Sequence, residues 1–106
     1  MKDNVVKDKS LEFAVRIVNL YKFLVNEQKE FVMSKQILRS GTSIGANIRE
    51  AEQAQSRADF INKLNIALKE ANETEYWLEL LIRTEYITRE QYESINNDST
   101  EINKLL

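Results

Sequence analysis

The chain has 106 residues, a formal net charge of −2 and 42% hydrophobic residues, with only two glycines and no proline, cysteine or histidine. This length is enough for one domain with a single core. The missing cysteine and histidine exclude disulfides, structural zinc sites, thiol nucleophiles and histidine-based catalysis within this chain. Because few positions favour tight turns and no stretch alternates like a strand, we expect an all-α fold.

Residues 1 to about 6 are predicted to form a frayed lead-in. The first ten residues are charged and have no apolar centre, so they do not resemble a signal peptide, and no window approaches the roughly 20 apolar residues of a membrane span. A cysteine-free chain of this kind suits a reducing compartment, so we expect a cytoplasmic protein that does not enter a membrane.

A first amphipathic helix is predicted over about 7–25. Its polar side mixes both charges, which is typical of a helix that packs on a protein core. The predicted seam is Leu11, Ala14, Val18, Tyr21 and Val25, widened by Phe13, Ile17, Leu20 and Leu24. The segment 26–30 is the predicted connection to the next helix.

A second helix, over about 31–54, is built from small residues around Gly41 and Gly45. A glycine inside a helix costs about 1 kcal/mol relative to alanine, so two glycines one turn apart need a compensating gain. The gain we predict is the close approach of another helix. A phosphate-binding glycine loop would need a preceding strand and a Gly-Lys-Ser/Thr ending, and the sequence has neither. The predicted core stripe is Ile37, Gly41, Ile44, Ile48, Ala51 and Gln55.

Two further faces of this helix differ in chemistry. One carries small polar groups that suit hydrogen bonds across a helix interface: Ser40, Ser43, Asn47, Glu50 and Ala54. The other carries Lys35, Arg39 and Arg49 among small side chains, a candidate surface for phosphate groups of a nucleic acid. The alternative is a solvated face whose arginines pair with nearby carboxylates.

A third helix is predicted over about 57–84, capped at its start by Ser56 with Asp59 three residues later. It would be roughly 40 Å long. Its predicted core seam is Phe60, Leu64, Ala67, Ala71, Thr74, Leu78 and Leu81.

The third helix also has a second apolar set: Ile66, Tyr76, Trp77 and Leu80. A helix that is apolar on more than one face must bury both. We predict that this set is a subunit interface and that the chain forms homo-oligomers, since aromatic residues favour interface anchors. The alternative is that Trp77 covers an edge of the core of its own chain.

A fourth helix is predicted over about 88–106. Thr88 and Gln91 have the spacing of a capping box, and the segment 96–100 is a poor helix former that we expect to bend or fray. Three short connections favour antiparallel neighbours. The predicted architecture is therefore a single-domain, up-down-up-down antiparallel four-helix bundle.

The only candidate for metal chemistry is the pair Glu70 and Glu73 on the third helix. Carboxylates at this spacing share a helix face and can hold Mg²⁺ through water, and the pair resembles a fragment of the all-α nucleoside triphosphate pyrophosphohydrolases. Those enzymes need a downstream lysine and a second acidic pair, which the last helix does not supply at a convincing spacing. We therefore predict no catalytic residues, no metal and no cofactor.

The run Ser43-Ile44-Gly45-Ala46-Asn47-Ile48-Arg49-Glu50-Ala51, with the later residues Asp59-Phe60 and Lys69-Glu70-Ala71, resembles the 23S rRNA-intervening-sequence protein family, also called S23 ribosomal protein-like. The resemblance covers essentially the whole chain and implies a left-handed four-helix bundle that assembles into a homopentameric ring. It does not imply a role as a ribosome component. The positions that match the family's recurring polar and small residues are Gly41, Ser43, Gly45, Asn47, Glu50 and Glu70.

A related branch of bundles with this fold binds nucleic acid and a reverse transcriptase through a basic surface, and this chain departs from it in its net negative charge. Three functional hypotheses follow. The first is a non-enzymatic oligomer associated with RNA, whose repeated cationic faces act together. The second is a scaffold that recruits a protein partner. The third is a Mg²⁺-dependent phosphohydrolase.

Overall fold

Four α-helices account for almost all of the chain in the computed structural model, which describes residues 3–106, with side chains from Val5 onward. No strand occurs in this range. The described part measures 43 × 22 × 18 Å along its principal axes. The helices are α1 (Asp3–Asn26), α2 (Met33–Glu52), α3 (Arg57–Arg83) and α4 (Arg89–Leu105).

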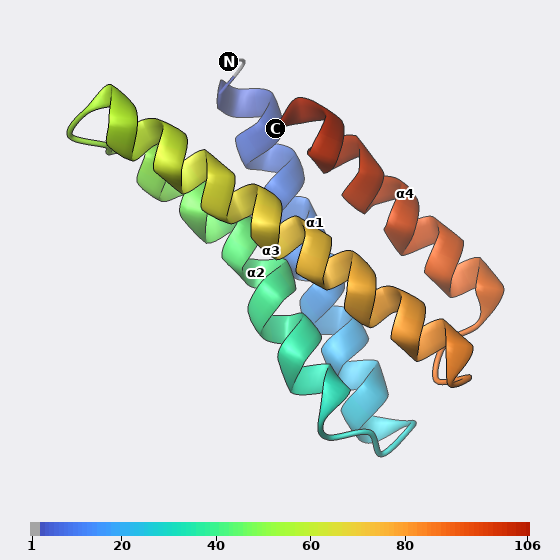
Figure 1. The fold of residues 1–106 in the computed structure, drawn as a ribbon. Coiled ribbons are helices and arrows are strands. Elements are labelled where there is room, and N and C mark those ends of the chain that lie inside the picture. The colour runs from blue at the N-terminus through green and yellow to red at the C-terminus, as the bar shows by residue number, and fades with distance from the viewer. Residues whose placement is uncertain (1–2) are drawn as a thin grey trace.

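Successive helices run in opposite directions, so the all-α, four-helix prediction is confirmed (Figure 1). α2 packs between α1 and α3, and α4 contacts α3 and α1. α1 and α3 do not pack on each other, so they occupy diagonal corners of the bundle and run in the same direction. None of the described helices combines the length and the apolar character that crossing a bilayer requires.

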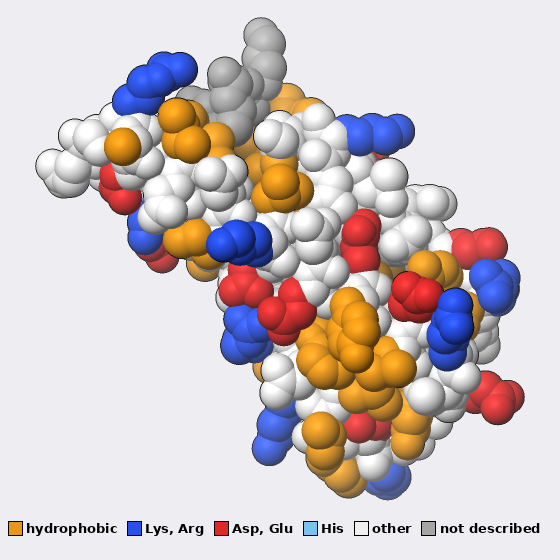
Figure 2. All heavy atoms as spheres, in the orientation of Figure 1, with side chains coloured by type: hydrophobic (Ala, Val, Ile, Leu, Met, Phe, Trp, Pro, Cys, Tyr) orange, Lys and Arg blue, Asp and Glu red, His pale blue; other side chains and the backbone are white. Residues whose placement is uncertain are grey.

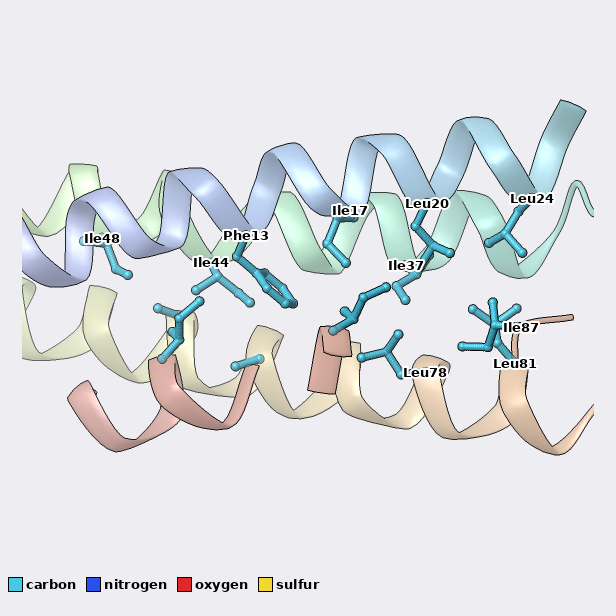
Figure 3. Packing of buried hydrophobic residues seen from close by; sticks show 14 of the residues in the cluster. Phe13, Ile17, Leu20, Leu24, Ile37, Ile44, Ile48, Leu78, Leu81 and Ile87 are labelled. Atoms are coloured by element: carbon cyan, nitrogen blue, oxygen red, sulfur yellow. The ribbon is translucent and has the colours of Figure 1, made fainter. Parts of the chain in front are cut away.

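The core fills the centre of the bundle along its length, with side chains of α1 and α2 pointing toward those of α3 (Figure 3). In α2 and α3 it follows the predicted stripes, except at their ends: Phe60 and Leu64 are only partly buried, and Gln55 is exposed beyond the end of α2. The fully buried large apolar side chains are Val6, Phe13, Ile17, Leu24, Ile37, Ile44, Ile48, Leu78, Leu81 and Ile102.

The predicted seam of α1 is wrong in its orientation. Leu11, its first member, is 50% exposed, and Ala14, Val18, Tyr21 and Val25 are only partly buried. The buried face is instead the flanking set of Phe13, Ile17, Leu20 and Leu24. Both seams have helical spacing, so periodicity alone did not separate them, and the fit against α2 decided which one faces inward.

That fit depends on the two glycines of α2. A Cβ atom at Gly41 would lie 2.7 Å from Cγ1 of Ile17, and a Cβ atom at Gly45 would lie 3.3 Å from Oγ of Ser10. Ser10 and Ile17 are both buried on α1. The prediction that the glycines permit close helix packing is therefore confirmed, and α1 is the partner helix.

The helix ends show two predicted caps and one that sequence reasoning missed. Oγ of Ser56 accepts a hydrogen bond from the backbone N–H of Asp59 at 3.1 Å, and Thr88 and Gln91 form the predicted capping box. α2 begins at Met33, two residues later than predicted, because the buried carboxylate of Glu30 accepts hydrogen bonds from the backbone N–H groups of Val32, Met33 and Ser34 at 3.2, 3.0 and 2.7 Å.

Other predicted bounds also shift. α1 begins at Asp3 in place of a frayed segment to about residue 6; residues 1 and 2 lie outside the described part. α2 ends at Glu52, two residues before the predicted end. α4 is a continuous helix through 96–100, so the predicted bend there is wrong. Burial of Ile95, Ser99 and Ile102 on one face holds this segment helical despite its low propensity.

Candidate interaction surfaces

The candidate metal pair of α3 is bound to an arginine. Nη1 of Arg39 on α2 donates to Oε2 of Glu70 at 2.9 Å, and Nη2 donates to Oε2 of Glu73. The indole N–H of Trp77 also donates to Oε2 of Glu73, at 3.0 Å. Within the described residues, no group of three or more acidic, histidine or cysteine side chains is arranged to hold a metal ion.

These contacts hold Glu73 and Arg39 in their charged forms. The hydrogen bond from Trp77, followed by that from Arg39, lowers the pKa of Glu73 below its ordinary value. The hydrogen bonds to Glu70 and Glu73 raise the pKa of Arg39. Arg39 is therefore occupied by carboxylates of its own chain, which is the alternative we gave for this face.

The other two cations of the predicted nucleic-acid surface have different surroundings. Lys35 and Arg49 are exposed on α2, and neither forms an ion pair with any of the described residues. Thr42 and Ala46, on the same side of the helix, are too small to shield them. Within the described residues, Lys35 and Arg49 are therefore unpaired on this face, whereas the charge of Arg39 is neutralised by Glu70 and Glu73.

The polar family positions divide into two groups. We predicted interhelical or intersubunit hydrogen bonds for these positions. Oγ of Ser43 donates to the carbonyl of Arg39 at 2.6 Å and the Asn47 amide donates to the carbonyl of Ser43 at 2.8 Å, so both bond within α2 in the single chain, and the intersubunit bonds stay a prediction. Their four-residue spacing places each side chain beside the carbonyl of the preceding turn.

Glu50 and Glu70 do reach another helix. Glu50 pairs with Lys63 of α3 at 2.8 Å, and Glu70 pairs with Arg39 of α2. A further interhelical contact joins the hydroxyl oxygens of Ser40 and Thr74, which lie 2.9 Å apart in the core.

The predicted interface set of α3 lies partly on an open surface. Tyr76 is 58% exposed, whereas Ile66, Trp77 and Leu80 are partly buried. Trp77 packs against the core cluster and meets the ring of Tyr76 edge-on at 5.0 Å between centroids. Trp77 thus covers an edge of the core of its own chain, and Tyr76 is the outward aromatic side chain.

Figure 2 shows an apolar patch with acidic and basic side chains around it, over the C-terminal half of α3. A shallow notch of about 220 Å³ lies beside it, lined by Tyr76, Glu79, Leu80 and Arg83. The notch provides a recess in which a side chain of a partner can pack.

Sequence reasoning missed further exposed apolar side chains outside α3. Leu11 and Val15 on α1 are 50% and 54% exposed, and Phe31 and Val32 in the α1–α2 connection are 52% and 71% exposed. For Leu11 the signal was present, because α1 has more apolar residues than one core face holds and we assigned Leu11 to the core seam. The chain therefore presents apolar side chains on α1 as well as on α3.

Comparison with known proteins identifies the family. A family model described as 23S rRNA-intervening sequence protein matches residues 2–106. A crystal structure of a protein of unknown function from the S23 ribosomal protein family of Bacteroides thetaiotaomicron VPI-5482 is 98% identical and superimposes with a TM-score of 0.94, over 99% of this chain and 90% of that chain. The comparison with curated proteins gives no match. The chain belongs to the 23S rRNA-intervening sequence protein family.

Proposed function

We propose that this protein is a self-associating four-helix-bundle module without enzymatic activity, whose copies join through apolar outer faces. One observation carries the proposal: large apolar side chains remain exposed although the core is already filled. They are Val5, Leu11, Val15, Phe31, Val32, Ile61 and Tyr76, each more than 40% exposed. Exposed apolar side chains that gather in a patch, as over the C-terminal half of α3, mark interaction sites in soluble proteins.

The assembly we propose is the homopentameric ring that the family resemblance implies, in the cytoplasm. Glu70 and Glu73 both form ion pairs with Arg39. A carboxylate pair neutralised by a guanidinium is a poor ligand for Mg²⁺, so these ion pairs support a non-enzymatic role. They argue against the phosphohydrolase hypothesis.

Sedimentation and light scattering test self-association. We expect a mass that is a multiple of the 12.4 kDa chain, five times it for the ring. The Tyr76→Glu variant should lose most of the assembly, because it places a charge in the apolar patch without touching the core. Leu105→Glu is the matched control, since Leu105 is a 40% exposed apolar residue near the end of α4. A wild-type protein that sediments as a single chain at micromolar concentration would refute the proposal.

A second candidate function is binding of structured RNA along α2. The observation that favours RNA binding is that Lys35 and Arg49 are exposed and form no ion pair within the described residues. Repetition of these two cations around an assembly would raise the effective affinity of a weak site. The protein-scaffold hypothesis is the competing interpretation of the same assembly.

The RNA function predicts binding that weakens steeply as salt concentration rises, because phosphate contacts release counterions. The double variant Lys35→Glu, Arg49→Glu should abolish it, and Lys104→Glu on α4 should not. Absence of binding at low ionic strength would reject the RNA function. Recovery of a protein partner without nucleic acid in a pull-down would then favour the scaffold.

A further inference from the structure

We infer that the α1–α2 connection binds an unpaired nucleotide of RNA, with the ring of Phe31 stacked on the base and Lys29 and Lys35 on the neighbouring phosphates. The inference rests on the RNA function proposed for α2, and it names the form of RNA that is bound. That form is a single-stranded segment, such as the loop of a hairpin, because the bases inside a duplex have no free face on which a ring can stack.

The aromatic ring lies where self-association leaves it free. Among the described residues, Phe31 and Val32 are the exposed large apolar side chains that belong to a connection and not to a helix. They lie at one end of the bundle, so copies that join through helix faces do not need to cover them. A ligand that approaches the end of the bundle can therefore reach the ring.

Burial in this connection is the reverse of what its side chains alone would favour. Glu30 is 7% exposed and Ser34 is fully buried. Phe31 and Val32, which lie between them, are 52% and 71% exposed. Burial stabilises an apolar side chain and destabilises a carboxylate unless the carboxylate is hydrogen-bonded. A connection that buries the acid and exposes the ring presents the ring for contact with another molecule.

Hydrogen bonds hold the connection in this shape from both sides. The carboxylate of Glu30 accepts three backbone N–H groups at the start of α2, and the N–H of Glu30 donates to the carbonyl of Leu24 on α1 at 2.9 Å. The Gln28 amide donates to the carbonyl of Tyr86 in the α3–α4 connection at 3.1 Å. Lys29 has a φ of 55°, in the left-handed region, which persists where the surrounding structure fixes it. A ring on such a fixed base loses little conformational entropy on binding.

The charges beside the ring suit a phosphate backbone. Lys29 and Lys35 are exposed on either side of Phe31 in the sequence, and neither forms an ion pair with the described residues. Glu30 is adjacent to Phe31, but its carboxylate points inward to backbone N–H groups, and the exposed acid of the connection is Glu27. Proteins that bind single-stranded nucleic acid combine cations with an aromatic stacking surface. An anionic ligand with an aromatic face therefore matches this site better than an uncharged apolar surface does.

The site continues the cationic face of α2. Lys35 belongs to both, and Arg49 lies fourteen residues further along the same side of the helix, at about 21 Å. Arg39, which lies between them, is neutralised by carboxylates of α3. The ring of Phe31 adds an uncharged contact at the end of a face that has lost one of its three cations.

Two RNA probes test the predicted preference: a labelled hairpin with a loop of unpaired adenosines, and a fully paired duplex of the same stem. In fluorescence anisotropy at low salt, we expect the wild-type protein to bind the hairpin more tightly. Phe31→Ala should raise the Kd for the hairpin by about five- to a hundredfold, the range for one base–aromatic stack, and should leave the Kd for the duplex unchanged. Phe31→Trp should retain the affinity for the hairpin, because tryptophan also offers a ring face.

Val32→Ala is the matched control, since Val32 is adjacent, apolar and more exposed but has no ring. It should leave the Kd for the hairpin unchanged. Salt dependence separates stacking from phosphate contact. Phe31→Ala should keep the wild-type slope of log Kd against log salt concentration, whereas Lys29→Ala and Lys35→Ala should each reduce it by about 0.7, because each phosphate contact releases counterions.

The outcomes separate this inference from the RNA function itself. Equal losses from Phe31→Ala and Val32→Ala would indicate a general apolar contact and would overturn the stacking inference. Equal binding of hairpin and duplex, with no effect of Phe31→Ala, would also overturn it and would leave RNA binding along α2 standing. No RNA binding by the wild-type protein at low ionic strength would overturn both. Unchanged far-ultraviolet circular dichroism of the variants checks that a loss of binding does not come from unfolding.

Discussion

Helices α2 and α4 are both amphipathic, but they are attached to the bundle in different ways. α2 packs closely on both of its neighbours: the side chain of Ile17 lies against Gly41, and the hydroxyl groups of Ser40 and Thr74 are in contact in the core. α4 buries only Ile95, Ser99 and Ile102 in full, and polar side chains attach it at its edges. The comparison separates the part of the fold that depends on close packing from the part that tolerates change.

The edge contacts of α4 are largely exposed. Arg16 of α1 pairs with Asp98 at 2.6 Å, Lys9 pairs with Glu101, and the Asn103 amide donates to Glu75 of α3 at 3.0 Å. Exposed ion pairs contribute about 0–1 kcal/mol each, so this attachment is weak and depends on salt. Most of the stability of the bundle should therefore come from α1, α2 and α3.

The largest expected effect comes from truncating one core isoleucine in each helix. Ile44→Ala on α2 should cost about 4 kcal/mol of unfolding free energy and Ile95→Ala on α4 about 2 kcal/mol, because the loosely held α4 can relax into the cavity. Urea unfolding at a fixed protein concentration measures both. Equal losses would remove the distinction between the two helices.

The two glycines of α2 should respond differently to substitution by alanine. Gly41→Ala places a methyl group against the β-branched, fully buried side chain of Ile17, and it should destabilise the protein by about 1–2 kcal/mol after the gain in helix propensity. The methyl group of Gly45→Ala would lie 3.3 Å from Oγ of Ser10 and 3.5 Å from its backbone carbon and Cβ, and the substitution should be neutral or stabilising by up to about 1 kcal/mol. Thermal unfolding of the two variants compares them, and a larger loss at Gly45 would mean that the closest approach of α1 and α2 lies elsewhere.

Two buried serines give a smaller contrast. Ser40→Ala removes a hydroxyl contact with Thr74 and should cost about 1 kcal/mol. The hydroxyl of Ser99 on α4 is fully buried without a hydrogen-bond partner among the described residues, so Ser99→Ala should leave stability unchanged or raise it by about 0.5 kcal/mol. Chemical denaturation distinguishes the two signs. Destabilisation by Ser99→Ala would indicate that its hydroxyl does have a partner.

The smallest effect concerns pH. The folded pKa of Glu73 lies below its ordinary value of 4.5, so its carboxylate stabilises the protein above that value, and this contribution is lost as the pH falls through the folded pKa. Because the side chain is 38% exposed, Glu73→Gln should cost no more than about 1 kcal/mol at pH 7. The difference from wild type should shrink as the pH falls below about 4.5. A difference that stays constant down to pH 3 would show that the charge of Glu73 is not the source.

Sequence reasoning placed most of the fold correctly because its signals are local. The caps at Ser56 and Thr88 depend on residues three positions apart, and the seam of α3 from Ala67 to Leu81 is set by spacing alone. The cap supplied by Glu30 was missed because Glu30 lies two residues before the N-cap Val32, outside the usual capping position, and reaches forward to the first N–H groups of α2.

Candidate surfaces were harder to predict, since they depend on which groups meet across helices. The sequence alone left two interpretations open for Arg39, a phosphate-binding cation or a partner of nearby carboxylates, and two for Trp77, an interface anchor or a cover for the edge of the core. Packing of α2 against α3 joins Arg39 to Glu70 and places Trp77 at the edge of the core.

By itself, the sequence determined four helices of nearly correct extent, their antiparallel order and the need for a close approach at Gly41 and Gly45. Helix propensity, capping and loop length act over a few residues, so they can be read along the chain. Only the tertiary structure decided which of the two apolar seams of α1 is buried and which cations of α2 stay open. Both outcomes depend on the shape and charge of the neighbouring helices, which no local pattern contains.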